Sequence, residues 1–196
     1  TYLITGGSSG FGLEVAKWMV KLGAKTLVLL SRSGPKTESE KNDVEVLREN
    51  NVNVVDARAD ISSEEDVIRI IEQIKSELPP LKGIIHGAMV LHDAFIRDLA
   101  SEDFEKVLRP KMIGAWLLHQ HTIDCELDYF ISFSSVSSMV GAGRQSNYCS
   151  GNLFLDALAH HRRFLGLPAL TVNWGALLEA GFVSRDKKTA QYLDKI

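Results

Sequence analysis

The glycine-rich stretch from Thr5 to Gly12 constrains the fold of this chain more than any other feature. It reads Thr5-Gly6-Gly7-Ser8-Ser9-Gly10-Phe11-Gly12 and lies between an apolar segment, 2–5, and an amphipathic one, 12–22. Glycines at such a junction allow a tight turn, and they let backbone amides approach an anion at a helix N-terminus. In this context the loop predicts a βαβ unit that binds the pyrophosphate of a dinucleotide. The alternative is a glycine-rich turn without a ligand.

The rest of the chain alternates between short apolar segments and helical patterns. Further strands are predicted over 26–30, 53–57, 83–88, 127–134 and 169–174, and helices over 12–22, 38–50, 62–78, 101–122 and 147–165. The first helix carries Val15, Trp18, Met19 and Leu22 at helical spacing. Six apolar strands separated by helices predict a Rossmann-like α/β fold, a doubly wound parallel sheet with helices on both faces.

The pattern predicts a single domain over residues 1–196. A complete doubly wound domain of this type usually adds another strand and helix, so we expect the sheet to be truncated after its sixth strand. The chain begins inside its first strand, as expected for a piece of a longer polypeptide. Residues 176–196 fit either a substrate lid or a truncated tail.

Composition excludes several classes of function. A formal net charge of −3, from 22 basic and 25 acidic residues, argues against nucleic-acid and membrane-surface partners. The chain shows no signal peptide and no membrane-spanning apolar run, so we expect a cytoplasmic protein. Cys125 and Cys149 make neither a disulfide framework nor a metal-ligand spacing. The adjacent His160 and His161 would point apart on a helix, and no metal site is expected.

The end of the second predicted strand indicates the type of dinucleotide. Sites that prefer NAD place a carboxylate there to bind the ribose hydroxyls, whereas this chain has Ser31-Arg32-Ser33. A guanidinium beside two hydroxyls suits a 2′-phosphate, so the sequence predicts NADPH. The alternative for Arg32 is a solvated surface arginine.

A serine and a tyrosine are predicted to face each other where the fifth strand ends. Ser135 follows that strand and Tyr148 opens the next helix, which places both over the crevice where such sheets bind ligands. Hydride addition to a ketone creates an alkoxide, which needs a proton donor. Tyr148 is the predicted donor, and Ser135 is predicted to donate a second hydrogen bond to the carbonyl oxygen.

The glycine loop, the serine and the tyrosine together resemble the short-chain dehydrogenase/reductase superfamily. Most members carry a lysine four residues after the tyrosine, but here Asn152 stands there and Lys111 lies upstream. This exchange resembles the ketoreductase domains of type I polyketide synthases and animal-type fatty acid synthases. Other segments that match are 29–34, 154–159 and 173–175.

The resemblance implies roles for the exchanged pair. Lys111 would supply the positive charge that makes the tyrosinate an acceptable conjugate base, and Asn152 would position Lys111 or a water beside it. Asp60 fits an adenine contact and a helix cap equally well. His86 is expected to pack rather than to catalyse. The residues expected to bind the cofactor are Thr5, Gly6, Gly7, Ser9, Gly10, Phe11, Gly12, Ser31, Arg32, Ser33, Asp60, Ile61, His86, Gly87, Ala88, Lys111, Tyr148, Asn173, Trp174 and Gly175.

Two local marks of the resembled ketoreductases bear on stereochemistry. Leu91-His92-Asp93 keeps two residues of a Leu-Asp-Asp motif, and Val140 stands where the opposite class has tryptophan. The resemblance therefore favours the B-type, which gives a D-configured 3-hydroxyl.

The resemblance also implies a substrate and partners. It implies reduction of a β-ketoacyl thioester carried on the phosphopantetheine of an acyl carrier protein. The expected neighbours are other synthase domains, including a structural half-domain. The alternatives are a free-standing short-chain dehydrogenase that acts on another ketone, and a catalytically silent nucleotide-binding domain.

Overall fold

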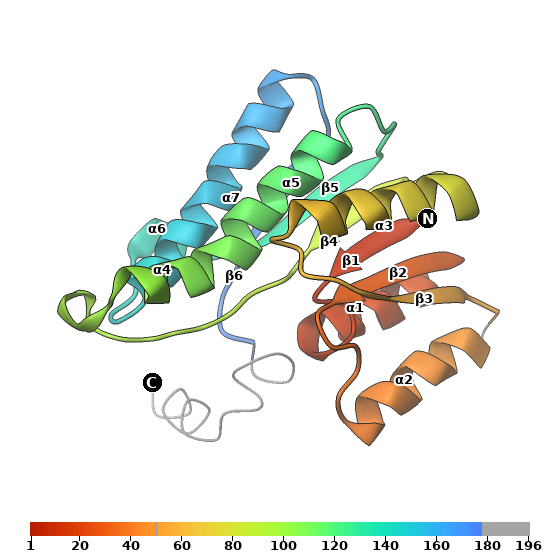
Figure 1. Ribbon diagram of the computed structural model, residues 1–196, viewed down its shortest axis with the longest axis horizontal. Helices are drawn as coiled ribbons and strands as arrows, with labels where there is room; N and C mark the ends of the chain where they lie inside the picture. Colours follow the sequence, from red (N-terminus) through yellow and green to blue (C-terminus); the bar gives the residue numbers. More distant parts are fainter. Residues whose placement is uncertain (50, 178–196) are drawn as a thin grey trace.

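The computed structural model describes residues 1–49 and 51–177. Its six strands form one parallel sheet. Figure 1 shows this sheet between its helices. The strands are β1 (Tyr2–Thr5), β2 (Thr26–Ser31), β3 (Asn53–Arg58), β4 (Gly83–His86), β5 (Tyr129–Ser135) and β6 (Leu170–Trp174). Their order in the sheet is β3-β2-β1-β4-β5-β6, with every pair parallel. The predicted doubly wound, Rossmann-like fold is confirmed.

The strand order reverses between β1 and β4, whose last residues, Thr5 and His86, are partners in register. Loops leave the carboxyl ends of these two strands toward opposite sides of the sheet, so a crevice opens between them. Ser135 and Trp174 end β5 and β6 side by side at the same edge. The glycine loop, Ser135 and the predicted cofactor-binding residue Trp174 therefore share one edge of the sheet.

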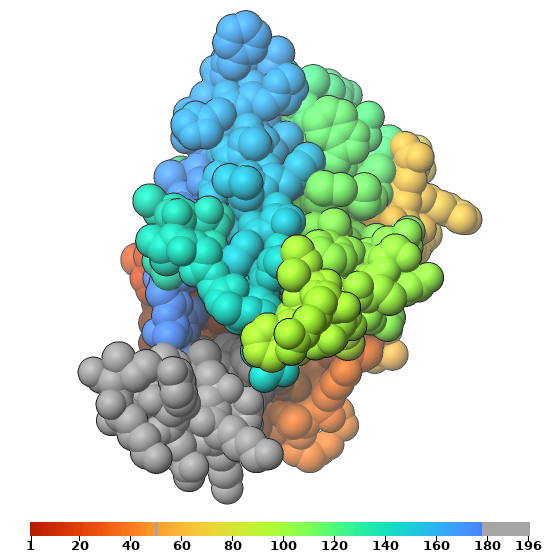
Figure 2. Space-filling view, turned by 90° about the vertical axis from the view of Figure 1, so that its left-hand side faces the viewer, coloured from red at the N-terminus to blue at the C-terminus, as the bar shows by residue number. Residues whose placement is uncertain are grey.

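Helices cover both faces of the sheet (Figure 1). The helices are α1 (Gly10–Lys21), α2 (Glu38–Glu49), α3 (Glu64–Glu77), α4 (Ser101–Leu108), α5 (Gly114–His121), α6 (Ser137–Val140) and α7 (Ser146–Phe164). One buried cluster joins Leu27 and Leu29 to α1 and α2, and another joins Leu3 and Ile84 to α3 and α5. In Figure 2, α7 lies along the surface beside α4 and α5, with which it completes the second layer.

The predicted apolar stripe of α1 is confirmed in part, since Val15 and Met19 pack against the core. Trp18 and Leu22, expected on the apolar stripe, are 59% and 68% exposed, whereas Leu13 and Ala16 are buried. The start of α1 packs tightly against the glycine loop, and the face that carries Leu13 and Ala16 meets the sheet. In α3, by contrast, the apolar residues at helical spacing are all buried, namely Val67, Ile70, Ile71 and Ile74. Ser63 caps this helix by accepting from Asp66 N.

The single helix predicted over 101–122 is three segments. A π-helical turn, η2 (Arg109–Ile113), separates α4 from α5. Pro110 has no N–H to donate, so the regular i→i−4 ladder is interrupted here and the wider turn replaces it. The turn places the side chain of Lys111 inside the protein, where it is 2% exposed.

Other boundaries differ by a few residues. The fourth strand ends at His86 rather than at Ala88, the fifth runs to Ser135, and the short helices η1 (Ile96–Asp98) and α6 were not predicted.

Two predictions concern the end of the chain and membranes. The region expected to be a lid or a tail, 176–196, lies outside the described residues from 178 onward. Within residues 1–49 and 51–177, no helix combines the length and apolarity needed to cross a bilayer.

Candidate active site

Two adjoining cavities form one cleft over the carboxyl ends of β1 and β4. Their volumes are about 750 Å³ and about 570 Å³, and both are lined by Gly6, Ser9 and Met89. The first cavity is also lined by the predicted residues Ser31, Arg32, Ser33, Asp60, Ile61 and Ala88. The second is lined by Gly10, Phe11, Gly12, Gly87, Leu91, Asp93, Lys111, Ser135, Tyr148, Trp174 and Gly175.

Several predicted residues support the cleft from behind. The hydroxyl of the fully buried Thr5 lies 2.9 Å from His86 Nδ1 and accepts from the backbone N–H groups of Gly87 and Ala88 at 3.2 Å each. Gly7 is likewise buried, with β1 directly beneath it. These residues hold the ends of β1 and β4 together, so they shape the cleft wall instead of lining it.

The glycine loop needs glycine at its two ends. Gly6 has φ +70°, a left-handed conformation, and a Cβ on Gly12 would overlap the carbonyl oxygen of Gly6. Ser9 is the N-cap of α1, but its side chain makes no capping hydrogen bond, and Ser9 and Gly10 both line the cavities. The backbone amides at the start of this twelve-residue helix therefore face the cleft, as an anion site requires.

The far end of the first cavity is basic. Arg32 and Ser33 are exposed there, while Ser31 Oγ donates to Ser8 Oγ at 3.0 Å and accepts from Gly34 N at 2.9 Å. The cavity is also lined by three basic residues that the sequence analysis missed, Lys36, Lys106 and Arg109. Lys36 follows Arg32 in the same loop, so the sequence alone could have identified it as a residue of this site. Lys106 and Arg109 could not be identified in this way, because only the packing of α4 and η2 brings them to the cavity.

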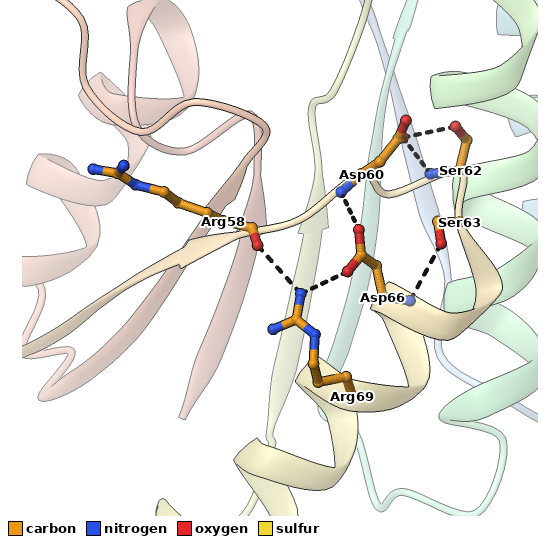
Figure 3. Close-up of polar contacts among 6 residues, drawn as sticks. All are labelled: Arg58, Asp60, Ser62, Ser63, Asp66 and Arg69. Atoms are coloured by element: carbon orange, nitrogen blue, oxygen red, sulfur yellow. Dashed lines mark hydrogen bonds and ion pairs between the residues drawn. The ribbon is translucent and has the colours of Figure 1, made fainter.

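Asp60 lines the first cavity, and Figure 3 shows the hydrogen bonds that hold it in place. Its carboxylate accepts from Ser62 N at 2.9 Å and from Ser62 Oγ at 2.7 Å, while Ser63 caps α3. Burial would raise the pKa of Asp60, but the Ser62 hydrogen bonds and the charges of Arg32 and Arg109 bring it below its ordinary value. Asp60 is thus a charged turn residue on the cavity wall and is not the N-cap of α3.

Tyr148, Ser135 and Lys111 meet in the second cavity. The Nζ atom of Lys111 lies 5.3 Å from the centroid of the Tyr148 ring and donates to the carbonyl oxygen of Phe133 at 2.8 Å. Burial raises the pKa of Tyr148, and hydrogen bonding with the Asn152 and Ser135 side chains opposes that rise. Three elements, β5, η2 and α7, thus bring the predicted hydroxyl, phenol and amine to one end of the cleft.

Lys111 is buried with little compensating charge. Its pKa is lowered to about 7 by burial, and the charge of Asp156 opposes this shift. At neutral pH the amine is therefore poised between its charged and neutral forms. His86, which lies beneath it with Nε2 3.3 Å from Lys111 O, is held neutral because burial and the Lys111 charge lower its pKa to about 3. A neutral, fully hydrogen-bonded His86 fits the packing role expected for it.

Asn152 is fully buried beside the tyrosine. Its Nδ2 donates to Tyr148 O at 3.0 Å, and within the described chain its Oδ1 is buried with no hydrogen-bond partner. The structure therefore brings Asn152 to Tyr148, while the amine of Lys111 is bonded to Phe133 instead. A buried amide oxygen without a partner is suited to an ordered water.

The residues linked to stereochemistry separate into two groups. Leu91 and Asp93 line the second cavity, and Asp93 accepts from Gln145 Nε2 at 2.9 Å. The imidazole of His92 instead lies 3.3 Å from the Asp103 carboxylate on α4, and Val140 is 81% exposed on α6.

A polar cluster behind Ser135 was not predicted. Asp156 accepts from Ser138 Oγ at 2.7 Å and from Asn173 Nδ2 at 3.2 Å, so Asn173 contacts this cluster and not the cleft. The sequence offered little indication of this cluster, because a single aspartate in a helix, such as Asp156, is usually exposed to solvent. Three aromatic rings, those of Phe11, Phe133 and Trp174, pack edge to face or tilted at 4.9–5.9 Å in the floor of the second cavity.

Comparison with known proteins agrees with this geometry. The family model of the KR domain matches residues 1–179. The highly reducing polyketide synthase phiA of Fungal sp. is 37% identical over 195 residues, which cover 100% of this chain and 8% of that protein. The chain thus spans only a small part of the curated relatives it matches.

Two solved structures share the fold closely. A ketoreductase domain from the bacillaene assembly line has a TM-score of 0.91 and 36% identity, covering 99% of this chain and 48% of that one. A structure of A-type ketoreductases from a modular polyketide synthase has the same TM-score and identity, with coverage of 98% and 40%. The chain belongs to the KR domain family, the ketoreductase domains of polyketide synthases.

Proposed function

We propose that this chain reduces a β-ketoacyl thioester to the β-hydroxyacyl thioester with NADPH, the acyl chain being carried on an acyl carrier protein. The observation that carries the proposal is the continuous cleft with Arg32 at one end and Tyr148, Ser135 and Lys111 at the other. The carrier protein and neighbouring synthase domains, including a structural half-domain, follow from the kinship with polyketide synthases. We place this reaction in the cytoplasm.

The residues of the cleft fit the chemistry of a dinucleotide phosphate. The start of α1 offers uncapped amides to a pyrophosphate, and Arg32 with Ser33 offers a charged, exposed site to a 2′-phosphate. Asp60 and Ile61 would border the adenine, and Phe11, Trp174 and Gly175 the nicotinamide. When bound, the reduced nicotinamide supplies the hydride.

The protein's own part in the reaction is to polarise and protonate the carbonyl oxygen. Ser135 donates a hydrogen bond to that oxygen, and the phenol of Tyr148 transfers its proton to the alkoxide as it forms. The resulting phenolate is stabilised by Lys111, whose ammonium lies near the ring. Asn152 fixes the first turn of α7, which keeps the phenol aimed into the cleft.

We propose B-type stereochemistry with a D-configured 3-hydroxyl. Leu91 and Asp93 face the cleft, where they can guide the thioester arm, and the position of Val140 carries no tryptophan. His92 departs from the motif, but its side chain is directed to Asp103, away from the lining of the cleft.

The test measures NADPH oxidation and product configuration. The chain is incubated with NADPH and a β-ketoacyl chain on a phosphopantetheinylated carrier protein, and with a small cyclic ketone as surrogate. We expect turnover of both and a D-3-hydroxyacyl product by chiral chromatography. Cofactor binding without turnover of either ketone would identify a silent domain, and a dominant L product would overturn the stereochemical part alone.

A further inference from the structure

A carboxylate without a cationic partner lies behind the reacting end of the cleft. Asp156 is half-buried on α7, and among the described residues no lysine or arginine lies within ion-pair distance of it. Its partners are all neutral donors, the Ser138 hydroxyl and the Asn173 amide. A half-buried carboxylate that three neutral hydrogen bonds hold in one place is a fixed point to which neighbouring segments can be tied.

The hydrogen-bond partners of Asp156 also contact the backbone of Ser135. Ser138 Oγ lies 2.7 Å from Asp156 Oδ2 and 2.8 Å from Ser135 O, so its single proton is shared between these two acceptors. Asn173 Nδ2 lies 2.9 Å from Ser138 Oγ and 3.3 Å from Ser135 O. The carboxylate thereby anchors the turn between β5 and α6 that presents the Ser135 hydroxyl to the cleft.

The same network reaches the helix that carries Tyr148. Asn173 Nδ2 lies 3.3 Å from Ser134 Oγ, and that hydroxyl donates to Asn152 O at 3.3 Å. Since Asn152 Nδ2 is bonded to Tyr148 O, the cluster links β5, β6, α6 and the first two turns of α7. These are the elements that carry the serine, the tyrosine and the asparagine of the site.

Asp156 also supplies negative charge near Lys111. Within residues 1–49 and 51–177, the titratable groups that face Lys111 are Tyr148 and Asp156 on α7 and the neutral His86 on β4. Of these, Asp156 is the carboxylate whose charge opposes the effect of burial on the amine.

We propose that Asp156 is a positioning residue of the reduction, because it anchors the Ser135 turn through Ser138 and Asn173. Its carboxylate is also the negative charge that favours the ammonium form of Lys111 against the effect of burial. The proposal rests on the proposed function for its kinetic consequence, but not for its structural one. Asp156 touches neither ketone nor cofactor in this role. It acts through the two groups that do the chemistry.

Two variants separate the anchoring from the charge. Asp156→Asn removes the charge, whereas Ser138→Ala removes the hydroxyl link and keeps the charge. We expect kcat on the carrier-bound substrate to fall at least 10-fold in both, with KM changed less than threefold, since neither residue contacts the substrate. Only Asp156→Asn is expected to move the alkaline limb of the pH–kcat profile to lower pH, by about half to one unit, because Lys111 then loses its proton sooner.

A readout independent of turnover completes the test. The titration midpoint of the Lys111 amine, followed by NMR in the cofactor-free chain and assigned with Lys111→Met, should fall in Asp156→Asn and stay in place in Ser138→Ala. Asp124→Asn, which removes an exposed carboxylate far from the site, is the matched control and should leave both readouts unchanged. If the titration midpoint of the Lys111 amine did not shift in folded Asp156→Asn, the effect of the Asp156 charge on Lys111 would be refuted. If Ser138→Ala kept the full kcat of the wild type, the anchoring of the Ser135 turn would be refuted. Failure of the wild-type chain to reduce any ketone would count against the proposed function, while the NMR result would still decide the charge role.

Discussion

The ammonium nitrogen of Lys111 lies 5.3 Å from the centroid of the Tyr148 ring, although the two residues are separated by 37 positions and come from different helical segments. The π-helical turn η2 buries the lysine, and the first turn of α7 brings the phenol over it. The pair therefore places the Tyr148 phenol, a weak acid, beside the Lys111 ammonium, whose positive charge stabilises the phenolate.

Removal of the phenol should stop the reaction and spare cofactor binding. In Tyr148→Phe the ring keeps its packing, but the alkoxide has no proton donor, so kcat should fall roughly 10²–10⁴-fold. The Kd for NADPH, measured by the change in its fluorescence on binding, should stay within about twofold of wild type. Unchanged turnover in this variant would refute the role of Tyr148.

Replacement of the buried Lys111 by an apolar residue should abolish activity and increase the free energy of unfolding. In the native chain the pKa of Lys111 is about 7 instead of 10.5, so the unfolded chain binds a proton that the native chain releases between these values. Stability therefore falls as pH drops from 10.5 toward 7 and then levels off. Lys111→Met should abolish turnover yet raise the free energy of unfolding at pH 7 by on the order of 1–4 kcal/mol.

The pH dependence supplies the check on that prediction. Thermal melts should show a larger gain in Tm for Lys111→Met at pH 7 than at pH 10, because most of the cost of burying the charged lysine has been relieved at pH 10, where the native amine is neutral and the unfolded amine has begun to lose its proton. Lys21→Met, on the exposed end of α1, should leave Tm nearly unchanged at both values. A lower Tm for Lys111→Met at every pH would contradict the prediction.

Arg32 should govern the preference for NADPH over NADH. The guanidinium is exposed at the basic end of the first cavity, and a charged hydrogen bond to phosphate contributes about 1.5–3 kcal/mol. Arg32→Ala should therefore raise KM for NADPH about 10–100-fold and leave KM for NADH nearly unchanged. Arg58→Ala, which removes a 69% exposed guanidinium at the end of the neighbouring strand β3, is the control. Equal loss with both cofactors in Arg32→Ala would count against the 2′-phosphate assignment.

The sequence predicted the sheet and most of the site because both depend on local patterns. The number and order of the strands, the glycine loop and the positions of Ser135 and Tyr148 follow from period and spacing within short segments. On α1 the prediction was wrong for Trp18 and Leu22, because the side of a helix that is buried depends on how it packs on the sheet, which a local pattern does not encode. The π-helical turn that aims Lys111 inward was missed because Pro110 signals an interruption but not its geometry. Asp156 was missed since its partners, Ser138 and Asn173, come from two other elements.

Acid should destabilise the domain through two buried histidines. The pKa of His86 is lowered to about 3 by burial and the Lys111 charge, and that of His119 is lowered by burial and the Arg162 and His161 charges. Both are neutral in the native chain, whereas in the unfolded chain they take up protons near pH 6.5. Stability should therefore fall as pH drops below about 6.5.

His119 allows that dependence to be assigned. Its Nδ1 lies 3.0 Å from Arg162 NH1 and must accept that hydrogen bond, a role that a glutamine oxygen can fill. His119→Gln should flatten part of the loss of Tm between pH 6.5 and 5, and the exposed His160→Gln should not. Identical pH–Tm curves for His119→Gln and wild type would show that His119 is not a source of the acid sensitivity.

The glycine loop leaves no room for a side chain at Gly12. A Cβ on Gly12 would overlap the carbonyl oxygen of Gly6, a backbone atom that cannot turn aside, so Gly12→Ala should displace the start of α1 from β1. Because the amides at that helix start face the cleft, the displacement should cost both stability and NADPH affinity, and we expect a lower Tm and a Kd raised at least 10-fold. Gly143→Ala is the matched control, since a Cβ there meets nothing within 4 Å. If Gly12→Ala bound NADPH as tightly as Gly143→Ala, the cofactor could not depend on the close approach of this helix to the loop, and the anion site would have to be sought at another part of the cleft.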